Sequence, residues 1–135
     1  MTESVLDPKE LNPLTQSDLA RKNFEFGKKM LAAGDVRRAL RYLEISAEQE
    51  PCGKTLLLMA QVELERPDLQ HKALEHLKLA VTVEPQHTAS WLLLAAYWAV
   101  RHETEKQRRC LEKILAYDPA NADAQRAVND LDLWS

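Results

Sequence analysis

The chain has 135 residues, of which 45% are hydrophobic and 29% charged, and its net charge is −3. This length suffices for a domain with a buried core, and only 3 glycines argue against a sheet-rich fold with many tight turns. The mild negative charge disfavours a duplex-binding protein, which usually carries a strongly basic surface. The most apolar run, residues 91–100, would form a helix of about 15 Å, about half of a bilayer core, so no membrane span is expected.

The compartment is indicated by the start of the chain and by its cysteines. Residues 1–8 are polar and lack the basic cluster and apolar core of a signal peptide. Cys52 and Cys110 are too few for a disulfide framework and too far apart for a metal knuckle. We therefore expect a reducing compartment and a cytoplasmic location.

Residues 1–16 are predicted to be an N-terminal arm, extended or mobile, because Pro8 and Pro13 interrupt scattered apolar side chains. A folded domain is expected from residue 17 to residue 135. Thr15 or Ser17 could cap its first helix.

A period of 34 residues follows the arm. Pro51, Pro85 and Pro119 are spaced by this interval, and an acidic residue precedes each of them. A 34-residue period is the length of one helix–turn–helix unit. The sequence therefore predicts three contiguous repeats, 20–53, 54–87 and 88–121.

Each repeat is predicted to contain two amphipathic helices, because apolar positions recur at intervals of three and four. Breaks between the two helices are expected at Gly34-Asp35, at Pro67-Asp68 and, more weakly, at His102-Glu103. Small residues should let the paired helices approach closely. They are Gly27, Ala95, Ala39 and Ala73.

Residues 122–134 are predicted to form a seventh, capping helix, because an open stack must cover its last apolar face. Asn121 could cap its start. Its inner stripe would be Ala124, Ala127, Val128 and Leu131.

Residues 20–121 resemble the tetratricopeptide repeat family in period and in their pattern of small and large residues. The matching residues are, by repeat, Phe26, Gly27, Gly34, Ala39, Leu43 and Pro51; Ala60, Ala73, Leu77, Ala80 and Pro85; and Trp91, Leu94, Ala95, Leu111 and Pro119. The resemblance implies an all-α, right-handed superhelix of about seven helices. Gln61 and Gln107 replace small residues of the family pattern, and the helix spacing could be wider there.

Two short motifs resemble a phosphate-binding loop and a metal-binding histidine pair, but a structural interpretation is favoured for both. Residues 53–55 copy the end of a phosphate-binding loop, but Glu48 stands where that motif needs glycine, so a turn between repeats is favoured. His71 and His76 are five residues apart, about 140° around a helix, whereas metal-binding pairs usually sit four apart. Exposed helix histidines are therefore expected.

Cys110 follows Arg108 and Arg109, whose charge could lower its pKa, but no histidine at helical spacing could act as its base. A structural or surface thiol is favoured. We predict a protein that is not an enzyme and uses no metal or cofactor.

In the family's architecture the first helix of each repeat lines the concave side of the superhelix, and the resemblance places a partner-binding groove there. The groove would be basic at one end and apolar elsewhere. Its predicted residues are Arg21, Phe24, Lys28, Leu31, Thr55, Leu58, Val62, Glu65, Leu92, Ala96 and Ala99.

The family's co-chaperones that hold acidic C-termini of heat-shock proteins use a clamp of lysine, asparagine and arginine on these helices. Here the matching places hold Phe24, Lys28, Met59, Ala89 and Leu93. Lys28 alone among them can hydrogen-bond a carboxylate through its side chain. A carboxylate clamp is therefore not expected.

The predicted function is a protein-interaction adaptor that holds a partner peptide or helix through apolar anchors. The alternative is a chaperone for a hydrophobic client, similar to three-repeat bacterial type III secretion chaperones. An RNA-binding helical repeat is disfavoured, since such proteins contact bases with polar side chains.

Two further surfaces stay open at this point. The basic first repeat, with Arg37, Arg38 and Arg41 among its cations, is either a solvated face or a docking patch for an acidic partner. Apolar residues of the arm could fill the groove of the same chain or of a neighbour, giving autoinhibition or a homodimer. They are Leu6, Leu11 and Leu14.

Overall fold

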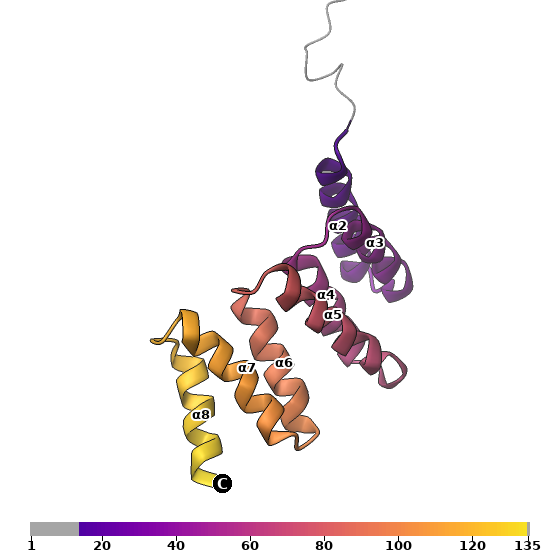
Figure 1. The fold of residues 1–135 in the computed structure, drawn as a ribbon. Coiled ribbons are helices and arrows are strands. Elements are labelled where there is room, and N and C mark those ends of the chain that lie inside the picture. Colours follow the sequence, from indigo (N-terminus) through magenta and orange to yellow (C-terminus); the bar gives the residue numbers. More distant parts are fainter. Residues whose placement is uncertain (1–13, 135) are drawn as a thin grey trace, which may run out of the picture. The chain divides into compact units, whose positions relative to one another are not determined.

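A computed structural model describes residues 14–134. In this range the chain forms seven α-helices and one 3-10 turn, and no strand occurs (Figure 1). The elements are α2 (Gln16–Ala32), α3 (Val36–Gln49), α4 (Gly53–Leu64), η1 (Pro67–Leu69), α5 (Gln70–Val83), α6 (Thr88–Val100), α7 (Thr104–Tyr117) and α8 (Ala122–Trp134). The predicted all-α fold is confirmed, while the calls on the arm through residue 13, including Leu6 and Leu11, lie outside the described residues.

The chain divides into two compact units, Met1–Glu50 and Pro51–Ser135. In unit 1, α3 packs against α2. In unit 2, α4 pairs with α5 and α6 pairs with α7, and α8 packs on α7. Among residues 14–134, no helix combines the length and the apolar character that crossing a membrane requires.

The acid–proline pairs mark the end of the second helix of each pair. Glu50, Glu84 and Asp118 are the C-cap residues of α3, α5 and α7, with φ of −154°, −128° and −137°. Each still donates its backbone N–H to the carbonyl four residues earlier. Their backbones are extended because the ring of a following proline disfavours the helical conformation. The 34-residue period is thus a period of helix ends.

The breaks within the pairs also follow the period. Gly34, after α2, has a φ of 80°, and His102, two periods later and after α6, has a φ of 58°. Both lie in the left-handed region that ends helices. In the middle pair, Pro67 opens the 3-10 turn η1 instead. All three predicted breaks are confirmed.

Close helix contact in unit 1 depends on Gly27. A Cβ at this position would lie 2.7 Å from Leu43 Cδ2 and 3.3 Å from the carbonyl oxygen of Ala39. Ser46 Oγ also donates to the Ala20 carbonyl at 2.6 Å, which joins α3 to α2 in the interior. Thr15 caps α2: its hydroxyl accepts from Asp18 N at 3.0 Å.

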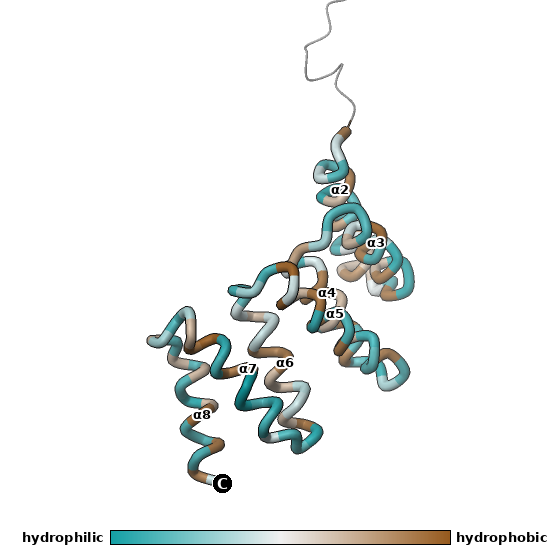
Figure 2. Tube along the Cα trace, viewed as in Figure 1, coloured by the Kyte–Doolittle hydropathy of each residue, from teal (hydrophilic) through white to brown (hydrophobic). Residues whose placement is uncertain are grey.

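The core of unit 2 contains one continuous cluster of buried residues from α4 to α8. Its members are Ala60, Ala73, Leu77, Leu94, Ala95, Cys110, Leu111, Ile114 and Ala124. Teal and brown segments alternate along the helices in Figure 2, as expected when one face is buried and the other solvated. Gln61, one of the two departures from the small-residue pattern, points to solvent, and its neighbour Ala60 is buried instead.

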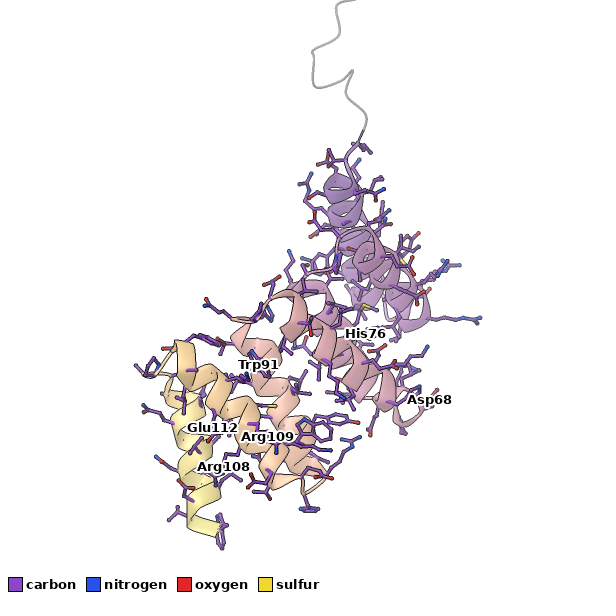
Figure 3. All side chains as sticks on the ribbon, in the orientation of Figure 1. Asp68, His76, Trp91, Arg108, Arg109 and Glu112 are labelled. Atoms are coloured by element: carbon purple, nitrogen blue, oxygen red, sulfur yellow. The ribbon has the colours of Figure 1, made fainter. Side chains whose placement is uncertain are left out.

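Helix α8 caps the last pair as predicted. Asn121 Oδ1 accepts from Ala124 N at 2.9 Å, and Ala127, Val128 and Leu131 pack against the core. Arg108, labelled on α7 in Figure 3, pairs with Asp132 of α8 at 2.9 Å.

Candidate functional site

The candidate site is the apolar face that α4 and α6 share within unit 2. These two first helices contact each other. Leu58 and Val62 of α4 lie four residues apart, as do Leu92 and Ala96 of α6, so each pair falls on one helix face. Ala96 is exposed, and the other three are partly buried. These four residues, two on each of two contacting helices, are called the α4–α6 strip below.

The two helices differ in polarity where they end. Ala99 extends the strip by one more turn of α6 and is partly buried. Glu65, the C-cap residue of α4 and the equivalent of Ala99 one repeat earlier, is exposed and carries a carboxylate. Leu92 also packs against the core of unit 2, so part of its side chain is already engaged.

The predicted residues of unit 1 have mostly found partners inside the unit. Phe24 is buried, with 5% exposure, and Lys28 Nζ lies 5.2 Å from the centre of its ring. Lys28 also pairs with Glu25 at 3.3 Å, and Arg21 pairs with Asp18 at 3.0 Å. These contacts leave Phe24 little surface for a partner and partly neutralise both cations.

Thr55 of α4 is also buried, with 2% exposure, and its hydroxyl lies 3.2 Å from Cys52 Sγ. Leu31 of α2 is partly buried. The predicted residues that keep exposed or partly exposed apolar side chains in unit 2 are therefore on α4 and α6.

The start of α4 is a turn between helix pairs, as the sequence favours. Glu84 Oε1 accepts from Gly53 N at 2.8 Å, so a carboxylate already occupies the place where a phosphate would bind. The His87 ring covers Gly53, where a Cβ would lie 2.7 Å from the ring. His87 Nδ1 is in turn 2.6 Å from Ser90 Oγ.

The expectation of an exposed His76 is wrong. Its ring, labelled on α5 in Figure 3, is partly buried. Nδ1 lies 2.7 Å from Oε1 of the buried Glu63 of α4, so the pair joins α4 to α5. Burial of the Glu63 carboxylate requires such a partner. His71 is exposed, as predicted. Within residues 14–134, no group of three His, Cys, Asp or Glu side chains is arranged to hold a metal.

Cys110 is a structural thiol. It is buried in the core of unit 2, and burial raises its pKa to about 11. The neighbouring Arg108 is engaged by Asp132 of α8. The thiol is therefore protonated and unreactive near neutral pH.

A second surface feature lies on α2, within the basic first repeat, but the exposed aromatic ring at its centre was not predicted from the sequence. A hollow of about 360 Å³ is lined by Arg21, Lys22, Glu25, Phe26 and Lys29. Phe26 is 46% exposed at this place and contacts Tyr42 of α3 in a tilted arrangement, with ring centres 5.5 Å apart. A comparison of equivalent positions in the three repeats could have found it, because only the first repeat has lysines flanking this position.

No protein-family model matches the chain, and neither does any curated protein. Several solved structures are similar. The first tetratricopeptide-repeat domain of Spaghetti (RPAP3), bound to the HSP90 peptide SRMEEVD, has a TM-score of 0.71 at 18% identity and covers 88% of this chain and 94% of that one. The Arabidopsis OM64 domain has a TM-score of 0.71 at 13% identity, covering 89% and 99%.

MamA is also similar, with a TM-score of 0.69 at 20% identity. The match covers 84% of this chain and 62% of the MamA chain. These similarities concern the fold, and they agree with the helix pairs and the helix ends described above. The described part of the chain therefore has the tetratricopeptide-repeat fold.

Proposed function

We propose that this protein is a non-catalytic interaction scaffold that binds an apolar segment of a partner protein on the α4–α6 face of unit 2. The main support is the strip of Leu58, Val62, Leu92 and Ala96 on two contacting helices. Apolar side chains that share one face and keep part of their surface in solvent are typical of interaction surfaces, whereas isolated ones are not.

The chemistry of this face favours an apolar ligand over an acidic C-terminus. Met59 is buried, while Ala89 and Leu93 have no side-chain donor for a carboxylate. In the Spaghetti (RPAP3) structure the domain is bound to an HSP90 peptide. We propose that the present chain binds its partner without the carboxylate clamp, through side chains inserted between α4 and α6.

The test compares three acidic substitutions in capture of partners from a lysate of the source organism. Leu58→Asp and Ala96→Asp place a carboxylate on the proposed face. Leu79→Asp is the matched control, because Leu79 is 43% exposed on the second helix α5. A partner that needs the face should bind the first two variants at least about tenfold more weakly, since an unpaired carboxylate is costly to bury.

Circular dichroism melting should show that all three variants keep their helices. Capture of the same partner by all three at equal strength would contradict the proposal. The chaperone alternative uses the same face, and it would be favoured if the captured partner were insoluble when produced without this protein.

A further inference from the structure

The exposed face of α2 is equivalent to faces that are buried in the other repeats. Lys22, Phe26 and Lys29 define it and are all exposed. The residues one and two periods later are all buried: Leu56, Ala60 and Glu63 on α4, and Ser90, Leu94 and Tyr97 on α6. The first repeat thus presents, uncovered, the face that the later repeats bury.

Unit 2 shows which part of the chain lies next to such a helix. There α6 packs against α5, the helix that precedes it in the sequence. The chain that precedes α2 is residues 1–13, followed by Leu14 and the cap Thr15. By the same connectivity, the segment that precedes α2 in the sequence is the natural candidate to cover the α2 face.

The face has the chemistry of a site for an acidic segment with apolar side chains. Phe26 contributes an exposed aromatic ring to the lining of the hollow, and Lys29 Nζ lies 5.7 Å from its ring centre. No ion pair occurs for Lys22 or Lys29 among the described residues, so both ammonium groups can meet incoming carboxylates. Carboxylates and aliphatic side chains would complement these two features.

We propose that residues 1–13 of the same chain occupy the face of α2 formed by Lys22, Phe26 and Lys29. Their sequence offers carboxylates at Glu3, Asp7 and Glu10 for the lysines and aliphatic side chains at Val5, Leu6 and Leu11 for Phe26. Pro8 and Pro13 disfavour a regular helix, so the segment would bind in an extended form.

Reach and linkage favour this occupant over a separate molecule. Thirteen extended residues span up to about 43 Å, whereas Phe26 lies ten residues into α2, about 15 Å from its start. A short tether also gives an effective concentration on the order of millimolar. A second copy or another acidic protein lacks that advantage. The proposal concerns unit 1 and does not depend on the function proposed for unit 2.

Paramagnetic relaxation in the full-length protein tests the proposal. A nitroxide is attached to Ser4→Cys in a Cys52→Ser background. Serine preserves a polar N-cap for α4, and the buried Cys110 thiol, with its pKa of about 11, should stay unlabelled. Amide signals of residues 22–29 should be broadened most, and more strongly than those of Arg37–Arg41 on the neighbouring α3.

A matched pair of charge reversals makes the result specific. Lys22→Glu/Lys29→Glu should abolish the selective broadening, and Arg37→Glu/Arg41→Glu, with the same charge change in the same unit, should preserve it. Broadening that only declines evenly along α2 from its start would overturn the proposal, as would maximal broadening on α4 and α6. Broadening of unlabelled protein by an admixed labelled copy would assign the face to a second molecule instead.

Discussion

The replacement Gly27→Ala tests whether the close contact of α2 with α3 depends on the missing side chain. On its own, alanine in a helix interior is favoured over glycine by about 1 kcal/mol. Here the new Cβ would lie 2.7 Å from Leu43 Cδ2 and 2.8 Å from its Cγ. Leu43 is fully buried, and because protein interiors are close-packed, it can move aside only by displacing its neighbours.

The two effects have opposite signs, and the contact should dominate. Overpacking of a core costs about 1–3 kcal/mol, so after subtraction of the propensity gain we expect a net loss of about 1 kcal/mol. For a chain of this size that corresponds to a fall in melting temperature of about 4 °C. Urea unfolding followed by circular dichroism gives the free energy directly.

The matched control is Gln61→Ala, at the equivalent position of the second repeat, where the side chain is exposed. It should change stability by only a few tenths of a kcal/mol, in the favourable direction. If Gly27→Ala were as stable as the unchanged protein or more stable, the account of the α2–α3 contact would be refuted.

Three further outcomes are expected. Of the two thiols, Cys52 should react with a thiol reagent at pH 8 while Cys110 reacts only on unfolding, because burial raises its pKa to about 11; two equally fast thiols would contradict its burial. The backbone and side-chain hydrogen bonds of Thr15, with a smaller contribution from Arg21, hold the pKa of Asp18 below its ordinary value. A carboxyl group whose pKa is lowered by folding stabilises the protein at pH values above its ordinary pKa near 4, and this stabilisation disappears as the pH falls through the folded-state pKa. Asp18→Asn should therefore lower the melting temperature at pH 7 but hardly at pH 2. An equal loss at both pH values would exclude the carboxylate as the cause. Asn121→Ala should cost about 1 kcal/mol in urea unfolding through loss of the α8 cap, and an unchanged midpoint would show that this cap is dispensable.

The helix boundaries were predictable because they are set by local chemistry. A proline disfavours the helical backbone conformation in the residue before it. The acid–proline pairs therefore predict that the second helices end at Glu50, Glu84 and Asp118. Asn121 likewise predicts the start of α8, because its side chain caps the helix. Such signals act within a few residues and survive in any tertiary context.

The availability of the groove residues was harder to predict, because burial depends on neighbours that are distant in sequence. Phe24 and Leu58 occupy equivalent positions of the first and second repeats, yet Phe24 is buried and Leu58 is only partly buried. Glu63 and His76 form a pair across α4 and α5 that no spacing rule reveals. Periodicity identifies which residues are equivalent, but it does not show how much of each side chain is left for a partner.

The central claim, that unit 2 binds its partner between α4 and α6, is tested most directly by amide chemical-shift mapping. The captured partner's binding segment is titrated into the isotope-labelled full-length protein. The account predicts the largest shifts around Leu58, Val62 and Ala96, saturating together with a single affinity. Saturating shifts confined to the outer faces of α5 and α7, with these amides unmoved, would contradict it.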